Sequence, residues 1–457
     1  MTKIKFAILF SFITAMISQA VMGGENIKGQ PSIEDLVREQ AKLINDLKQR
    51  VNKLESSKDS GVAALPYNIT LENIAPRAMW AERTVIKGDF RYRHEYISDK
   101  SSNSIERNRQ RIRARIGLYS KVQDDLDVGF RIATSEASTA EEGADPRSTN
   151  QTLTNAFSKK SIWLDMAYVD WHPMDIAGLN TEGLHLIAGK MENPFYTAGK
   201  EQLIFDSDLT PEGGAVKYEK KFSDLNLKLF GNIGGFWVQE RSSDVDTSLW
   251  GFQGGFSQKL FADALEITGG LSLYAFGSIE DQRTLYTSTN SSGNTFYYFG
   301  AGGAREYQKD YDILNPFVEA KFNVFNMPVS VYGDFARNAT PNDNFAGLVG
   351  CKINKAKDPN TWEAFYNYRE VQPDAVLGAF TDSDFGNGLT GVKGHKFGFK
   401  YQLTKNVDIG TTLILSKIDM HAQSRNRVVN RLNLSSNVPF NRWEEYTRWQ
   451  VDLNVKF

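Results

Sequence analysis

The segment 106–122, ERNRQRIRARIGLYSKV, places an arginine at every second position over its central part. These arginines are Arg109, Arg111, Arg113 and Arg115. A guanidinium group keeps its positive charge at any ordinary pH and offers a planar fork of hydrogen-bond donors. A row of such groups on one surface attracts anions and orients dipolar solutes, so the chemistry it indicates is electrostatic.

Aliphatic residues fill most of the positions between these arginines, which gives the segment a period of two. A β-strand points successive side chains to opposite faces, whereas a helix would scatter the arginines around its surface. A nucleic-acid-binding arm would explain the arginines but not the aliphatic residues. Two settings remain, a soluble sandwich with arginines facing water and an outer-membrane barrel whose arginines face a wet interior.

The composition narrows the class of protein. The chain has 457 residues, a formal charge of -2 and 41% hydrophobic residues. The near-neutral charge argues against nucleic acid as a partner, and no apolar run long enough for a transmembrane helix follows residue 25. The single cysteine, Cys351, excludes an internal disulfide. The length suits several soluble domains or one large barrel.

The first 84 residues divide into three predicted regions. Residues 1–20 have the basic start, apolar centre and small cleavage-site residues of a secretory signal peptide, so the mature protein leaves the cytoplasm. Residues 31–56 carry apolar heptads and predict a periplasmic coiled-coil helix, whose broad seam favours a homotrimer. The alternative is a single amphipathic helix that lies against its own domain. Residues 57–84 predict a linker.

Alternation of apolar and polar residues dominates the remainder, residues 85–457, in about sixteen segments. The segments are centred near residues 91, 114, 130, 166, 187, 218, 231, 253, 271, 318, 333, 350, 365, 399, 413 and 451. Their connections alternate between long and short. The long ones lie near 97–106, 135–160, 192–212, 238–247, 280–311, 371–393 and 420–444. Long loops on one rim and short turns on the other are typical of an outer-membrane barrel, and a soluble sandwich has no reason for this sorting.

Both ends of this region fall on the short-turn rim, which requires an even number of strands. The last segment, YTRWQVDLNVKF, alternates to its end and finishes on the aromatic Phe457. We therefore predict an all-β fold, a transmembrane antiparallel β-barrel of about sixteen strands over residues 85–457, preceded by the short coiled-coil helix.

Four stretches carry a resemblance to a known family. They are RNRQRIRARIGLYSKVQDDLDVGFRIAT at 107–134, MAYVDWHP at 166–173, GLHLIAGKMENPF at 183–195 and FDSDLTPEGGAV at 205–216. In these stretches the chain resembles the putative porins of Gram-negative outer membranes, which carry a signal peptide, a short coiled coil and a barrel. The resemblance implies passive passage of small hydrophilic solutes or ions, without catalytic residues or cofactors. The C-terminal Phe457 resembles the signal read by the barrel assembly machinery.

Seven arginines are predicted to line the pore as a basic wall. They are Arg91, Arg93, Arg109, Arg111, Arg113, Arg115 and Arg131. A barrel of this width holds an aqueous channel, and each arginine that faced lipid at the bilayer centre would cost about 2–4 kcal/mol. The aliphatic residues of the 106–122 segment therefore face outer-membrane lipid and lipopolysaccharide, and the arginines face the lumen.

The third long loop, 192–212, is predicted to form a constriction through Glu201, Asp206 and Asp208. In sixteen-stranded porins the third loop folds into the lumen, and by analogy these carboxylates would lie across from the basic wall. The apolar trio 203–205 favours this placement because it needs a surface to bury against. The alternative is that the loop caps the outer rim and the arginines pair with carboxylates. Those carboxylates are Asp89, Glu95 and Asp127.

Other functions have weaker support in the sequence. The five histidines show no metal-ligand spacing, and the acids at 382–384 are only a weak calcium candidate. No nucleophile and base stand together, which disfavours an outer-membrane enzyme. The chain is also similar in layout to phosphate- and anion-selective porins, and a barrel that acts through its long loops as a receptor or adhesin is a further alternative.

Overall fold

The computed structural model describes residues 82–101, 105–139, 143–287, 289–299, 304–340, 342–420 and 443–457, together with Gln49. The described strands all belong to one compact unit, residues 76–457. The predicted signal peptide at 1–20 lies outside the described residues. So do the coiled-coil helix at 31–56 and the linker at 57–84, apart from Gln49 and residues 82–84. None of the described helical segments is long and apolar enough to cross a membrane.

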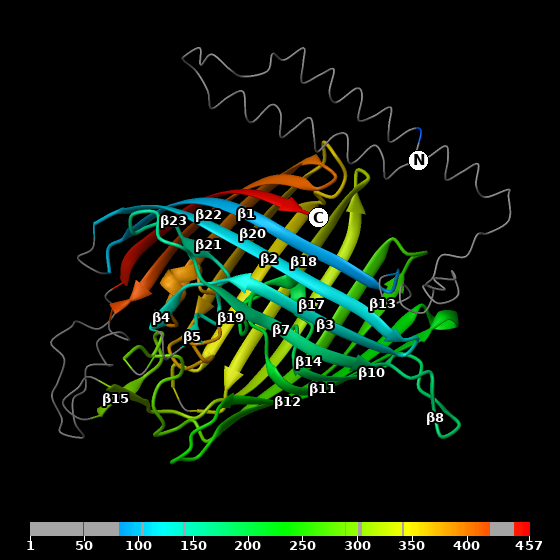
Figure 1. Cartoon of the computed structure of the whole chain (residues 1–457), viewed down its shortest axis with the longest axis horizontal. Coiled ribbons are helices and arrows are strands. Elements are labelled where there is room, and N and C mark those ends of the chain that lie inside the picture. The colour runs from blue at the N-terminus through cyan, green and yellow to red at the C-terminus, as the bar shows by residue number, and fades with distance from the viewer. Residues whose placement is uncertain are drawn as a thin grey trace, which may run out of the picture. The chain divides into compact units, whose positions relative to one another are not determined.

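Sixteen long strands of the described chain form one closed antiparallel sheet (Figure 1). They are β1 (Thr84–Asp99), β2 (Arg107–Gln123), β3 (Leu126–Thr134), β7 (Ile162–Trp171), β10 (Leu184–Lys190), β11 (Glu212–Phe222), β12 (Leu227–Gln239), β13 (Thr247–Leu260), β14 (Leu265–Gly277), β17 (Asp312–Val324), β18 (Met327–Asn338), β19 (Phe345–Asn354), β20 (Trp362–Val371), β21 (Val392–Thr404), β22 (Val407–Asp419) and β23 (Trp443–Lys456). Each strand pairs with the next, and β1 also pairs with β23, which closes the barrel. Each predicted segment centre falls within one of these strands, so the predicted barrel is confirmed.

Short elements occupy some of the connections. They are β4 (Ala137–Thr139), β5 (Gly143–Ala144), β6 (Gln151–Thr152), β8 (Asp175–Ile176), β9 (Leu179–Asn180), β15 (Phe296–Phe299), β16 (Ala304–Tyr307) and the 3-10 turns η1 (Ala198–Lys200), η2 (Ser223–Leu225) and η3 (Phe385–Gly388). Of these, β6 extends the sheet by pairing with β2. The connection between β18 and β19 lies on the same rim as the long loops but is itself short. It was accordingly not among the long connections predicted from the sequence.

Alternation decides which face of each strand is exposed. On β2, the side chains of Ile116 and Leu118 are 47% and 45% exposed, whereas that of Arg111 on the same strand is buried. Large apolar side chains are exposed in the same alternating way on other strands, for example Leu271 and Leu273 on β14. This apolar outer surface is far too extensive for water and suits a lipid surrounding.

Tight turns and a glycine complete the barrel. In the β17–β18 turn, Phe325 and Asn326 have φ angles of 49° and 62°, the left-handed geometry of a tight hairpin whose twist matches its strands. At the seam, Gly88 and Phe457 exchange two backbone hydrogen bonds of 3.0 Å. A Cβ atom on Gly88 would lie 2.4 Å from the ring of Phe457, so only glycine leaves room for this C-terminal aromatic residue.

Candidate functional site

Arginines of β1 and β2 face one another across the strand pair. Arg91 is opposite Arg113, and Arg93 is opposite Arg111, in the antiparallel register. Like charges directly opposite each other destabilise a sheet, so these pairs need counter-charge from other groups.

Carboxylates on β1 supply part of that counter-charge. Asp89 accepts from the Nε atoms of Arg113 at 2.8 Å and of Arg115 at 2.7 Å, so one carboxylate serves two guanidiniums. The fully buried carboxylate of Glu95 likewise accepts a hydrogen bond from the Nε of Arg109. Much of the predicted basic wall is therefore ion-paired within the sheet, as one of the sequence alternatives proposed.

Arg131 lies apart from the other six arginines of the predicted wall. Its Nε donates to Asp165 of β7, and its Nη1 lies 3.7 Å from Glu192 at the start of the long connection after β10. Asp127 was expected by that alternative to pair with an arginine. Instead it lies 3.4 Å from His172 on the short-turn rim, because the β2–β3 register places it opposite Lys121, beyond the arginine row.

The connection between β10 and β11, here called the 191–211 loop, crosses the interior of the barrel. Near its end, Asp208 lies 3.4 Å from Arg115 of β2. Nearer its start, Glu201 accepts hydrogen bonds from Tyr332 of β18 at 2.9 Å and Asn367 of β20 at 3.1 Å. Those strands lie on the opposite side of the closed sheet from β10 and β11. The loop therefore touches two opposite walls.

A second loop enters the interior, the 372–391 loop between β20 and β21, which sequence reasoning missed. Its Asp384 lies 2.7 Å from Arg448 of β23 and 3.1 Å from Arg93 of β1. Burial opposes ionisation of Asp384, but these two guanidiniums outweigh burial and hold its pKa well below the usual value. The acids at 382–384 were the available signal, and they serve as counter-ions for arginine.

Asp382 of the same loop belongs to a separate ionic cluster. It lies 2.9 Å from Arg369 and 3.2 Å from Lys396, and Glu201 lies 3.4 Å from the same Arg369. Arg369 is 1% exposed, so its charge requires these carboxylates. Glu201 is thus paired with Arg369 of β20, on the side of the closed sheet opposite β2. Its predicted role in a constriction stays a prediction.

The two inward loops bond to each other. The backbone N–H of Asp206 donates to the carbonyl of Phe380 at 2.7 Å, and the N–H of Ser383 donates to the Asp206 carboxylate at 2.9 Å. The hydroxyl of Thr381 donates to the carbonyl of Leu203 at 2.8 Å. The 191–211 and 372–391 loops therefore form one internal layer.

The pKa values of Asp206 and Asp208 are shifted in opposite directions, although the two residues are only two positions apart. Burial and the carboxylates of Asp208 and Asp382 raise the pKa of Asp206 well above its usual value. Burial also disfavours the charged form of Asp208, but the guanidiniums of Arg113 and Arg115 outweigh it and hold the pKa of Asp208 below its usual value. Of the two, Asp208 is the carboxylate that carries charge beside the arginines.

Another part of the interior is filled by apolar side chains. Phe195 and Phe205 of the 191–211 loop each lie 5.0 Å from the ring of Tyr274 on β14, and Phe195 also packs edge-on against Phe236 of β12. The apolar trio 203–205 is buried in this cluster. On this side, inward residues that contact the loop, such as Phe236 and Tyr274, are large and apolar, whereas other inward residues of β12–β14, such as Gln253 and Ser272, are buried and polar.

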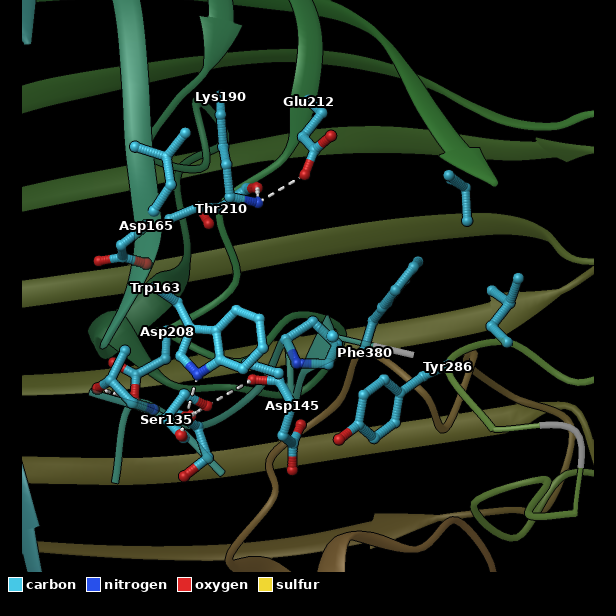
Figure 2. A pocket seen from close by; sticks show the side chains of 18 of the residues that line it. Ser135, Asp145, Trp163, Asp165, Lys190, Asp208, Thr210, Glu212, Tyr286 and Phe380 are labelled. Carbon is cyan, nitrogen blue, oxygen red and sulfur yellow. Dashed lines mark hydrogen bonds and ion pairs between the residues drawn. The ribbon is translucent and has the colours of Figure 1, made fainter. Parts of the chain in front are cut away.

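Two cavities lie beside the inward loops. The larger, about 1080 Å³, is lined by residues of β3, β7, β10, β11 and β12 and of the long loops, among them Trp163, Lys190 and Asp208 (Figure 2). In Figure 2 the indole of Trp163 donates to the carbonyl of Ser135, at 3.2 Å. The smaller, about 180 Å³, is lined by Arg91 and by residues of both inward loops. The walls of both cavities include Asp208.

Metal chemistry has no visible support in the described part of the chain. No group of three or more His, Cys, Asp or Glu side chains there has the arrangement to hold a metal ion. The acids at 382–384 are engaged with arginine and lysine instead.

The sequence matches the family described as Putative porin over residues 98–299 and 345–438, which is more than half of its length. The chain belongs to the putative porin family. The family and the closed barrel indicate an outer-membrane protein. No curated protein matches the sequence significantly.

Several solved porins have similar folds. The high-pH structure of OprB from Pseudomonas putida has 11% sequence identity and a TM-score of 0.51, covering 85% of this chain and 97% of OprB. OmpF of Salmonella typhi in complex with daunomycin has 13% identity and a TM-score of 0.43, covering 82% and 97% of the two chains. The outer-membrane channel DcaP of Acinetobacter baumannii has the same identity, coverage and TM-score. At such identities the likeness concerns the fold alone.

Proposed function

We propose that this porin-family protein is a passive diffusion channel for small hydrophilic solutes or ions in a Gram-negative outer membrane. Solutes would move along the basic wall of β1–β3, where the 191–211 and 372–391 loops narrow the route. The observation that carries the proposal is a pair of cavities, about 1080 and 180 Å³, whose walls share Asp208 and of which the smaller is lined by arginines of this wall.

The charges beside the route would select solutes by their own charge and dipole. Arginines of β1 and β2 stand on one side, and Asp208 and Asp384 reach them from the inward loops. Fixed charges of opposite sign across a narrow space produce a transverse field that orients dipolar solutes. Such a channel needs no catalytic residue and no cofactor.

The inward loops favour a channel over a receptor or adhesin. Asp206, Asp208, Asp382 and Asp384 are all committed to contacts inside the barrel. A receptor built on its loops would present such groups outward. We further propose cleavage of the signal peptide after Ala20, assembly through the C-terminal Phe457, contact with lipopolysaccharide, and association as a homotrimer.

The reversal potential of the purified protein in a planar bilayer under a salt gradient tests the channel. We expect stable conductance steps, and a shift of selectivity toward cations when Arg111 and Arg113 are both changed to Ser, because two positive charges are lost. Arg337→Ser is the matched control, since Arg337 is exposed at the end of β18. Well-folded protein that never conducts would contradict the proposal.

A further inference from the structure

Arg91 and Arg93, two inward arginines of β1, have different cross-strand neighbours. Arg93 lies opposite Asp452 on β23 and makes two hydrogen bonds to it, at 2.6 and 2.7 Å. Arg91 lies opposite Asn454 on β23 and Arg113 on β2. Neither neighbour carries a negative charge. Accordingly, no ion pair within 4 Å involves Arg91 among the described residues.

The hydrogen bonds of Arg91 are also incomplete. Its Nη2 donates to the side-chain oxygen of Asn150, but its Nε is buried without any partner among the described residues. Asn454 does not serve it either, since its side-chain amide nitrogen donates to Asp408 at 2.8 Å and its side chain makes no hydrogen bond to this Nε. A buried guanidinium nitrogen without an acceptor is costly, so an acceptor is expected to reach it.

Carboxylates close to Arg91 are already engaged. Asp89 is shared between Arg113 and Arg115, and Asp208 lies 3.4 Å from Arg115 and accepts from the hydroxyl of Thr149 at 2.9 Å. Neither of these two carboxylates therefore forms an ion pair with Arg91.

A cavity of about 180 Å³ opens at this place. Five basic side chains and four aspartates line it, namely Arg91, Arg93, Arg113, Arg147, Lys396, Asp206, Asp208, Asp382 and Asp384. It is polar and large enough for a small anion together with several water molecules. A guanidinium offers two parallel N–H donors to an oxyanion, which is the geometry that binds sulfate, phosphate and carboxylate best.

We propose that Arg91 and Arg113 form a binding site for a small tetrahedral oxyanion such as sulfate or phosphate in this cavity. The anion would accept from the guanidinium groups of Arg91 and Arg113, which both line the cavity. It would thereby replace the carboxylate that β23 supplies to Arg93 but not to Arg91. The site rests on the proposed channel function, because the anion must enter through the channel. It adds to that function an oxyanion as the ligand that permeates or blocks the channel.

Isothermal titration calorimetry of the full-length folded protein in detergent tests the site, with inorganic sulfate as the probe. Chloride keeps the ionic strength constant, so nonspecific screening is matched. We expect saturable binding of one sulfate per chain in the wild-type protein. Arg91→Gln should weaken it about tenfold or more, because a charge-assisted hydrogen bond is lost. Arg91→Lys keeps the charge but not the fork, and should bind with intermediate affinity.

Arg337→Gln is the matched control, because it removes one arginine charge from an exposed position outside the cavity. It should leave sulfate affinity unchanged. The proposal is overturned if the wild-type protein shows no saturable sulfate binding, an outcome that requires no variant to fold. Equal loss of affinity in Arg91→Gln and Arg337→Gln would overturn it as well.

Conductance measured in parallel separates this proposal from that of the channel. Sulfate that binds to a protein without conductance would support the site and contradict the channel. A conducting protein whose chloride current is unaffected by sulfate, and which binds none in calorimetry, would keep the channel and overturn the site.

Discussion

The interior of the barrel has a charged side and an apolar side, although both are built from strands with the same alternation. On β1 and β23, inward residues such as Arg93, Glu95 and Arg448 meet one another and the 372–391 loop. On β12 and β14, inward residues such as Phe236 and Tyr274 pack against the 191–211 loop. The outward residues are apolar on both sides.

The difference lies in how completely each kind of contact fills space. Apolar packing is non-directional, so the aromatic side closes around the loop. Ion pairs require particular distances and angles, and removing their charges from water is costly, so water-filled space is expected to remain among them. The smaller cavity lies among the arginines and aspartates of the charged side, and the larger one extends from β3 and β7 to β12. We therefore expect the apolar side to set the width of the route and the charged side to set its selectivity.

The largest effect is expected from Asp384→Asn, on the charged side. The change leaves Arg93 and Arg448 without their shared carboxylate, and breaking such a buried pair costs about 3–5 kcal/mol. The 372–391 loop should become sensitive to protease, and the reversal potential should move toward anions. Asp263→Asn, in an exposed turn, is the matched control. An unchanged reversal potential in folded Asp384→Asn protein would remove this loop from the selectivity of the channel.

Leu203→Ala tests the apolar side and should cost about 2–5 kcal/mol of loop packing, as for other buried leucines. Leu203 is 1% exposed, whereas Leu225, the control position for the same change, is 61% exposed. We expect a larger single-channel conductance from Leu203→Ala with the same reversal potential. A shift in selectivity without a change in conductance would reverse the roles assigned to the two sides.

Asp208→Asn should have an intermediate effect of about 1.5–3 kcal/mol, the range for hydrogen bonds to a charged group. It removes the negative charge beside Arg115 and weakens the bonds from Thr149. Selectivity should move toward anions by less than in Asp384→Asn. The reversal potentials of the two variants, measured under one salt gradient, provide the check, and equal shifts would mean that Asp208 contributes as much as Asp384.

The smallest effect is expected from Asp206→Asn at low pH. The pKa of Asp206 is raised by burial and by Asp208 and Asp382. Its contribution to stability is therefore fully present below the usual aspartate pKa of about 4 and is lost as pH rises through the raised value. At low pH the variant should lose only about 1 kcal/mol, the value of one hydrogen bond from Ser383.

As pH rises, ionisation of Asp206 should move the reversal potential of the wild-type protein toward cations, and the variant should lack this step. Subtracting the titration curve of Asp206→Asn from that of the wild-type protein removes the contribution of other groups, including the histidines. Identical curves for the two proteins would show that Asp206 keeps one charge state over the whole range.

The barrel could be predicted from the sequence because alternation is a local property. Residues 109–118 show an arginine face and an aliphatic face whatever strand lies beside them, and the cost of charge in lipid decides which face is outward. Counting the alternating segments gave about sixteen strands, and the sorting of long and short connections required an even number. The apolar trio 203–205 likewise pointed to a buried loop from its composition alone.

The partners of the arginines were decided only by the tertiary structure. Asp384 and Asp452 follow Arg93 by several hundred residues, and they reach it because the sheet closes β1 against β23 and the 372–391 loop folds inward. The same closure places Asn454 beside Arg91 and leaves that arginine without a carboxylate. Local sequence determined the faces of each strand, whereas the pairing of charges depended on which distant strands and loops the closed barrel brings together.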